Sequence, residues 1–347
     1  MKPTPWRRAK TAALGWIGSI RRRALVLTYH RVADPPFDPN FLSVSPVNFA
    51  AHMEIVRRKF APVSLTHLVA RLREGALPRR SVVITFDDGY ADNLTFAKPI
   101  LERHGVPATV FVTTGPSRDG GPMWPDRLVE LLFEPRRLPQ TLSLPINGRE
   151  HRWDLAGADY ATEADYQRHR RWKMGQPDLG PRESTYRAVH ELLRRLPGRD
   201  RDDALAATAR WAGGIPASAT APRCLTAGEL RSLSRGGLIE IGGHTVSHPS
   251  LAALPEAEQW REVIDCRRAM EEALGVAITS FAYPYGGRDD FNDVSVRALR
   301  RAGFECACTT AARPVAPADD CFQIPRFHVN DCDANCFERA LNEWMLG

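Results

Sequence analysis

The fold is decided by one stretch of ten residues, 81–90, which reads SVVITFDDGY. Five of its first six residues, all but Ser81, are β-branched or apolar without polar alternation, a pattern typical of a strand that is buried on both faces in a parallel sheet. Two adjacent carboxylates, Asp87 and Asp88, and then Gly89 end the strand. Because ligands bind at the carboxyl ends of strands in α/β folds, the stretch predicts both the fold class and the place of the chemistry.

Two neighbouring carboxylates cannot both remain free anions in a dry pocket, so either one takes a proton or a cation shares the site. A second strand-like segment, residues 239–248, reads IEIGGHTVSH and ends in His244 and His248. Their i, i+4 spacing would place both imidazoles on one face of a helical turn. Two imidazoles and one carboxylate form a three-ligand divalent metal site with open positions, and the spare carboxylate can act as a base. This combination predicts a hydrolase.

The segments TFDDG (85–89) and HTVSH (244–248) together resemble the paired signatures of the polysaccharide deacetylase family, carbohydrate esterase family four, which includes the nodulation-type chitooligosaccharide deacetylases. The resemblance implies that Asp88, His244 and His248 hold a divalent metal, with zinc expected, and that Asp87 is the catalytic base. It also implies that the chain removes N-acetyl groups from an amino sugar in a polysaccharide, an oligosaccharide or a lipid-linked glycan. The implied fold is α/β, a deformed seven-stranded (β/α) barrel.

A third segment, FAYPYG (281–286), resembles another motif of the same family. The resemblance implies that the residue after the proline, Tyr285, lends its backbone N–H to the oxyanion. Many members carry an arginine in this motif that orients the base, whereas this chain has Ala282. Arg326, which closes a late predicted strand, is the candidate for that role. The Asp-and-Trp motif typical of the family is not recognisable here.

The general acid has two candidates, His30 and His328, which both end predicted strands. The strand that ends in Tyr29 and His30 resembles the opening strand of those family members that begin with a Tyr-His pair. That resemblance favours His30 as the acid. His328 is the alternative, because many other members place the acid at this late position.

The order of predicted strands and helices divides the chain into two barrel parts separated by an insertion. Strands and helices alternate on both sides of a region that breaks the pattern with a predicted hairpin and a helical stripe, so we expect one barrel split by a mostly helical insertion that covers its mouth. The expected divisions are a basic arm (1–23), the first barrel part (24–115), the insertion (116–222), the second barrel part (223–330) and a C-terminal tail (331–347).

The composition is ordinary for a globular protein, with 43% hydrophobic and 25% charged residues among 347. The formal net charge of +6 suits an anionic polymer, a lipid headgroup surface or nucleic acid, although a solvated basic face is the favoured explanation of each individual cluster. We expect no nucleic-acid partner. The arm carries Trp and Arg residues around a short apolar core, and no run of about 18 apolar residues occurs. We therefore expect an uncleaved arm that lies on the inner membrane surface of a cytoplasmic protein.

The seven cysteines cannot all pair within one chain. Their spacings do not match common zinc-binding patterns, so we expect mostly packed, reduced thiols, with a disulfide or a second metal site as the alternatives. They are Cys224, Cys266, Cys306, Cys308, Cys321, Cys332 and Cys336.

Three other functions remain open from the sequence. A deformylase acting on a lipid-linked amino sugar would use the same centre. A non-haem iron oxygenase also uses two histidines and one carboxylate, but it would leave Asp87 without a role and would favour an all-β jelly roll. A non-catalytic glycan-binding scaffold would not need the complete set of ligands and base.

Overall fold

Strand β5 (Ser81–Phe86) lies inside the main sheet, and all six of its residues are buried. The computed structural model describes residues 23–214 and 222–346. The strand order is β11-β10-β9-β6-β5-β1-β12, with β4 paired to β5 off this path, and every pairing in this sheet is parallel. The other strands of the sheet are β1 (Ala24–Tyr29), β4 (Ala61–Pro62), β6 (Ala108–Val112), β9 (Ile239–Gly243), β10 (Ser280–Ala282), β11 (Cys306–Cys308) and β12 (Phe327–His328).

Residues 324–328 connect the two ends of this sheet. Ile324 forms a parallel bridge with Cys308 of β11, and Phe327 pairs with Leu27 of β1 at the opposite end. The sheet therefore curls back on itself, and the expected deformed (β/α) barrel is confirmed.

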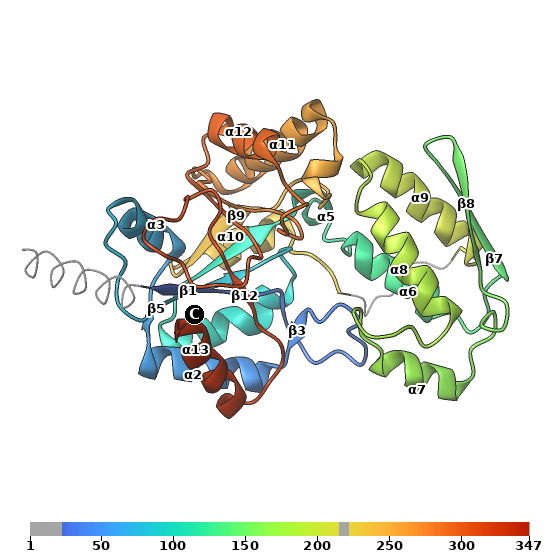
Figure 1. The fold of residues 1–347 in the computed structure, drawn as a ribbon, viewed down its shortest axis with the longest axis horizontal. Helices are drawn as coiled ribbons and strands as arrows, with labels where there is room; N and C mark the ends of the chain where they lie inside the picture. Colours follow the sequence, from blue (N-terminus) through green and yellow to red (C-terminus); the bar gives the residue numbers. More distant parts are fainter. Residues whose placement is uncertain (1–22, 215–221, 347) are drawn as a thin grey trace, which may run out of the picture.

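Both faces of the sheet are packed, which explains the unbroken apolar pattern of its strands. Val26 and Val83 belong to a core cluster inside the barrel, whereas their neighbours Leu27 and Ile84 face a larger cluster under the helices. Helices surround the sheet in Figure 1. They are α2 (Pro46–Lys59), α3 (Leu65–Arg73), α4 (Lys98–His104), α10 (Ala227–Ser234), α11 (Glu256–Leu274), α12 (Asp293–Ala302) and α13 (Ala334–Leu346).

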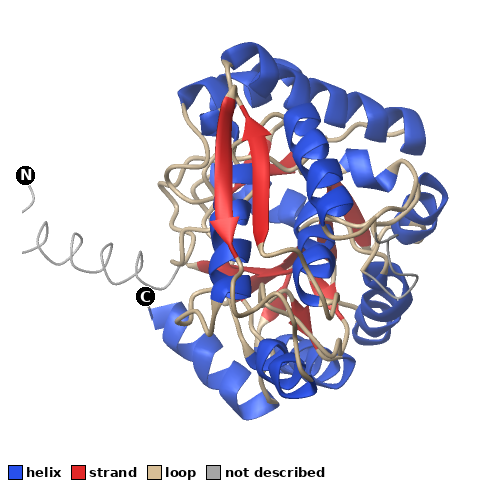
Figure 2. Cartoon of the chain, turned by 90° about the vertical axis from the view of Figure 1, so that its right-hand side faces the viewer, coloured by secondary structure: helices blue, strands red, loops and turns tan. Residues whose placement is uncertain are grey.

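The segment between β6 and α10 forms a separate group of helices beside the barrel, with a hairpin at its outer edge (Figure 1). Figure 2 looks onto this group, and the two hairpin strands run side by side in front of the helices. The group has its own hydrophobic core, to which the predicted stripe of Tyr186, Val189 and Leu193 contributes. Its elements are α6 (Trp124–Phe133), β7 (Thr141–Ile146), β8 (Arg149–Asp154), α7 (Glu163–Arg171), α8 (Pro181–Leu193) and α9 (Gly198–Trp211). The short helix α5 (Thr114–Ser117), which follows β6, lies at the barrel itself (Figure 1).

Three segments differ from a simple alternation of strands and helices. The pattern of residues 92–104 predicts one helix, but the segment begins as a π-helix (Asn93–Ala97) before α4. The late strand expected from Phe322 to Val329 is limited to the two residues of β12. The C-terminal tail contains helix α13, because Phe337 and Leu341 are fully buried against the main core. The remaining short elements are β2 (Arg31–Val32), β3 (Ser43–Val44) and the 3-10 helix η2 (Leu251–Ala253).

The basic arm falls almost entirely on residues 1–22, outside the described residues, so its expected membrane contact stays a prediction. Within residues 23–214 and 222–346, no helix is long and apolar enough to cross a bilayer. All seven cysteines are free thiols, four of them buried.

A substitution at Gly242 would test how tightly β9 packs inside the barrel. A Cβ there would lie 2.5 Å from Phe111 Cδ1 and 2.6 Å from Ser280 Oγ. We expect Gly242→Ala to lower the free energy of unfolding by about 1–3 kcal/mol because neighbouring side chains must shift, and urea denaturation measures this. The matched control is Gly228→Ala in α10, where the nearest atoms are 4.0 Å away and stability should stay equal or rise. Equal losses in both variants would contradict this account.

Candidate active site

The two adjacent aspartates reach the same pocket because the backbone bends between them. Asp87 continues the inward-facing side of β5, and the φ angle of Asp88 is 72°, in the left-handed region. A regular strand would point Asp88 to the opposite face, whereas this bend turns it toward the site. Both are buried, with 3% of Asp87 and 5% of Asp88 exposed.

Arg326 forms a two-pronged ion pair with Asp87. Its Nη1 lies 2.7 Å from Asp87 Oδ1 and its Nη2 lies 2.8 Å from Oδ2, and the guanidinium is fully buried. Arg326 also donates to Thr85 Oγ1 and to the carbonyl oxygen of Thr309. This geometry fixes both oxygens of Asp87 in one plane. Burial by itself would raise the pKa of Asp87, but the charge of Arg326, with that of His244, lowers it below its ordinary value.

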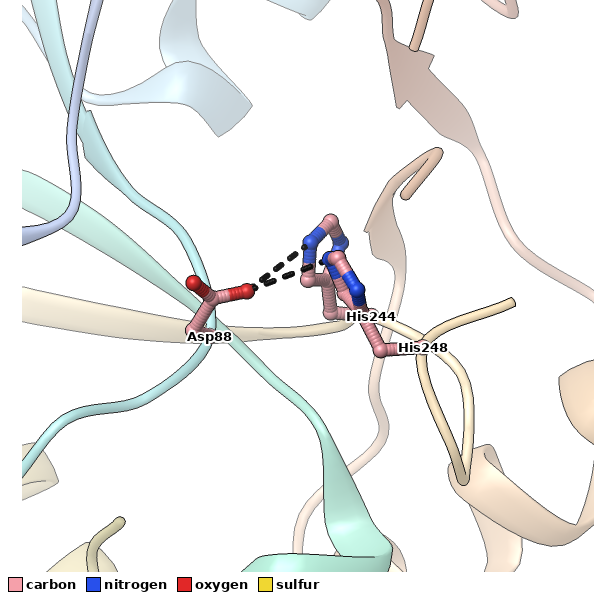
Figure 3. Close-up of side chains that lie close together, drawn as sticks. All are labelled: Asp88, His244 and His248. Atoms are coloured by element: carbon pink, nitrogen blue, oxygen red, sulfur yellow. Dashed lines mark ion pairs between the residues drawn. The ribbon is translucent and has the colours of Figure 1, made fainter. Parts of the chain in front are cut away.

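The two histidines converge on the other aspartate (Figure 3). Nε2 of His244 lies 3.5 Å and Nε2 of His248 lies 3.3 Å from Asp88 Oδ1. The segment between them is not the helical turn expected from the i, i+4 spacing. It is an irregular turn in which Thr245 and His248 have φ angles of 67° and 60°. The helical expectation was therefore wrong, although the tight turn still brings both rings to one side.

Local hydrogen bonds hold this turn and determine which ring nitrogen of His244 keeps a lone pair for a metal. His244 Nδ1 lies 2.8 Å from the carbonyl oxygen of Ala282, so this nitrogen carries the proton and Nε2 keeps its lone pair. Glu262 of α11 accepts hydrogen bonds from the backbone N–H groups of Val246 and Ser247 and from the Ser247 hydroxyl. Burial lowers the pKa of His248 to about 3, so this ring is neutral and can serve as a ligand.

The donor set of Asp88, His244 and His248 fits a divalent cation. One ligand atom from each residue lies within 4.8 Å of the others, and all three residues are buried. Asp88 Oδ1, which faces both Nε2 atoms, has no hydrogen-bond partner among the described residues. Burial would lower the pKa of His244, yet Asp87 and Asp88 together raise it, which shows that the two carboxylates favour positive charge beside them. A cation bound by these three side chains would supply that charge.

A cavity of about 350 Å³ opens above the two aspartates. Its polar lining includes both aspartates, both histidines and His30, and its apolar lining includes side chains of the insertion, such as Met123 and Met174. The lining residues are His30, Asn40, Leu42, Asp87, Asp88, Tyr90, Met123, Pro125, Met174, His190, His244, His248, Tyr285 and Thr310.

Tyr285 and the two candidate acids occupy different positions around the cavity. Tyr285 has a φ angle of 60°, and its backbone N–H donates to no atom of the described residues. His30 lines the cavity and its buried Nδ1 has no partner in that part of the chain. The His328 ring lies next to that of His30, with ring centroids 5.3 Å apart, and its Nε2 donates to the carbonyl oxygen of Phe41. His328 is absent from the cavity lining, so of the two histidines only His30 faces the cavity.

Sequence reasoning missed the residues that the insertion and the loops contribute to the cavity. His190 extends the predicted stripe of α8 by one position, four residues after Tyr186, and lies against Trp124 with ring centroids 4.9 Å apart. The helical spacing from Tyr186 could have identified it. Asn40, Met174 and the supporting carboxylate Glu262 carry no local signal, because only the folded chain brings them to the site.

A sequence model of the polysaccharide deacetylases matches residues 74–132 and 204–307. The poly-beta-1,6-N-acetyl-D-glucosamine N-deacetylase of Staphylococcus aureus strain MSSA476 is 33% identical over 105 residues, covering 26% of this chain and 36% of that protein. The match thus spans about a third of that relative's length. The Streptococcus pyogenes deacetylase PplD in complex with acetate aligns at TM-score 0.56 and 16% identity, covering 92% of this chain and 98% of PplD. IcaB from Ammonifex degensii aligns at TM-score 0.56 and 17% identity, covering 94% and 98%. At these identities the structures show a shared fold.

The buried carboxyl group of Asp126, in α6 beside the cavity, predicts how the stability of the protein depends on pH. Burial raises its pKa to about 7, although Tyr90 donates a hydrogen bond of 2.8 Å to its Oδ2. Between pH ~4 and 7 the folded chain therefore holds a proton that the unfolded chain releases, so the contribution of Asp126 to stability falls as pH rises through this window. We expect the unfolding free energy of the wild type, minus that of Asp126→Asn, to fall by roughly 3 kcal/mol from pH 4 to 8 in urea titrations. A constant difference would show that Asp126 is already ionised at pH 4.

Proposed function

Because the chain belongs to the polysaccharide deacetylase family, we propose that it hydrolyses the N-acetyl group of an amino sugar in a polysaccharide, oligosaccharide or lipid-linked glycan. The observation that carries this proposal is the meeting of a paired base, Asp87 with Arg326, and the donor set around Asp88 at the floor of one cavity. Amide hydrolysis needs an activated water, a polarised carbonyl group and an acid for the departing amine, and the cavity offers a group for each need.

Asp88, His244 and His248 would hold the divalent ion, with zinc expected from their nitrogen and oxygen donors. When bound, such an ion acts as a Lewis acid on the acetyl carbonyl group and lowers the pKa of water. Asp87 then accepts the proton of the attacking water. Its two bonds to Arg326 keep it ionised at neutral pH and prevent it from rotating toward the ligand set.

The remaining roles follow from position around the cavity. The free N–H of Tyr285 donates to the oxygen that becomes negative when water attacks the acetyl carbon. His30 gives a proton to the departing amine, because it faces the cavity and His328 does not. Leu42, Met123 and Met174 provide apolar contacts for the acetyl methyl group and the sugar ring.

The alternatives predict different products. The deformylase uses the same residues and differs only in the acyl group that is released. The oxygenase reading expected a jelly roll, whereas the sheet is parallel, and it leaves the Asp87–Arg326 pair without a role. The direct test is to measure acetate and formate released from defined N-acyl saccharides, with metal analysis of the same protein. Poly-beta-1,6-N-acetylglucosamine is the first substrate to assay, since the S. aureus relative is named for it. Acetate release would support the proposal, and a folded, metal-loaded protein that releases none from the panel would contradict it.

Asp87→Asn separates the base from the ligand set. We expect this variant to retain its metal, because Asp88, His244 and His248 are intact, and to lose about 10²–10⁴-fold in acetate release. The matched variant Asp88→Asn should lose metal as well as turnover, which elemental analysis measures after dialysis. Wild-type turnover in Asp87→Asn would remove this residue from the mechanism.

Arg326 gives a test based on the pH profile. In Arg326→Gln the lowering effect of the guanidinium is lost and burial of Asp87 dominates, so the acidic limb of the kcat/KM profile should move to higher pH. Arg326→Lys keeps a positive charge but cannot contact both oxygens, so we expect reduced turnover with an acidic limb closer to that of the wild type. Superimposable profiles for the wild type and Arg326→Gln would show that Arg326 does not control this ionisation.

A further inference from the structure

The turn that carries His248 is held from two sides, and only one of them is the barrel. Thr245 and His248 both have left-handed φ angles, which residues other than glycine adopt at a cost and keep only when the surroundings hold them. On the barrel side, Glu262 satisfies the backbone N–H groups of Val246 and Ser247. Thr114 and Gly115, which follow β6, donate to the carbonyl oxygens of Thr245 and Val246, so those of Ser247 and His248 are left to other partners.

The insertion supplies those partners. Arg201 of α9 donates through Nη2 to the carbonyl oxygen of Ser247 and through Nη1, at 3.5 Å, to that of His248. Trp124 of α6 donates through its indole Nε1 to the same His248 oxygen at 3.4 Å. The Arg201 guanidinium also lies over the Trp124 ring, 5.3 Å from its centroid. Two residues that are far apart in sequence thus meet at the backbone of one expected metal ligand.

The environment of Arg201 suits a residue that holds the turn in place. Only 1% of the residue is exposed, and among the described residues its two Nη atoms donate only to these two carbonyl oxygens while Nε has no partner. A buried guanidinium is costly unless it is well paired, so its contacts with the turn have to compensate for that cost. The first residue of α9, Gly198, fits against the turn so closely that a Cβ would lie 2.7 Å from Ser247 Oγ.

We propose that Arg201, assisted by Trp124, is a positioning residue that holds His248 in its metal-binding orientation. The proposal rests on the metal centre of the proposed function and extends it to the insertion. Groups that orient the ligands of a metal commonly change its affinity 10–100-fold when they are removed. Arg201 itself lies outside both segments that match the family model, so its role belongs to the insertion of this chain.

The test compares two buried arginines of the insertion. Arg182 of α8 is also 1% exposed and donates to the backbone carbonyl oxygens of Leu132, Pro135, Arg136 and Ala158, none of which belongs to the His248 turn. Arg201→Met and Arg182→Met both remove a buried charge with several backbone contacts. Urea denaturation of both variants checks that any difference in metal binding is not a general loss of stability.

The primary measurement is Zn²⁺ affinity by competition with a chelator, together with the visible absorption spectrum of the Co²⁺-loaded protein. We expect Arg201→Met to bind Zn²⁺ about 10–100-fold more weakly and to alter the Co²⁺ spectrum, while Arg182→Met stays within about 2-fold of the wild type. Arg201→Lys should recover part of the affinity, because it keeps a donor near the carbonyl oxygens. Equal affinities in the two Met variants would overturn the proposal.

If Arg201→Met does not fold, the variant Trp124→Phe tests whether the insertion positions His248. It keeps an aromatic ring under Arg201 and removes only the N–H that donates to His248. We expect Zn²⁺ affinity to fall about 3-fold, and an unchanged affinity and Co²⁺ spectrum would count against the proposal. A wild-type protein that binds neither Zn²⁺ nor Co²⁺ would instead remove the metal centre of the proposed function.

Discussion

Two buried carboxylates at the end of one strand are the constraint on which the rest of this structure depends. Asp87 and Asp88 are almost inaccessible to solvent, so their charges have to be balanced within the protein. The chain balances them separately. Arg326 pairs with Asp87, whereas Asp88 faces two imidazoles and has an oxygen that no described hydrogen bond satisfies. One carboxylate is therefore held in an ion pair, as the proposed base requires, and the other is available to a cation.

This division depends on how the barrel closes. Arg326 lies in the short segment that bridges β11 and pairs with β1, so its guanidinium enters the barrel beneath the end of β5. Residue 282, where the sequence resemblance implies an arginine, is alanine, and the ion pair with Asp87 comes from another strand. A partner can approach Asp87 from a different strand because the carboxyl ends of neighbouring parallel strands meet at one end of the barrel.

The insertion completes the site from the opposite side. It lines the cavity with Met123, Met174 and His190, and it contacts the backbone of the histidine turn through Arg201. The insertion therefore does more than cover the barrel, since it lines the cavity and contacts the turn that carries His248.

The sequence by itself determined the strand of residues 81–86, the alternation of strands and helices, and the two motifs that carry the aspartates and histidines, because these are local patterns of burial and residue type. It also indicated Arg326, as a residue closing a late predicted strand, and, through the family resemblance, His30. Only the tertiary structure decided that the turn at 244–248 is irregular, that His30 rather than His328 faces the cavity, and that Glu262 and Arg201 hold the turn. These features depend on contacts between residues far apart in the chain, and on backbone angles that neighbouring segments impose, so no local pattern could reveal them.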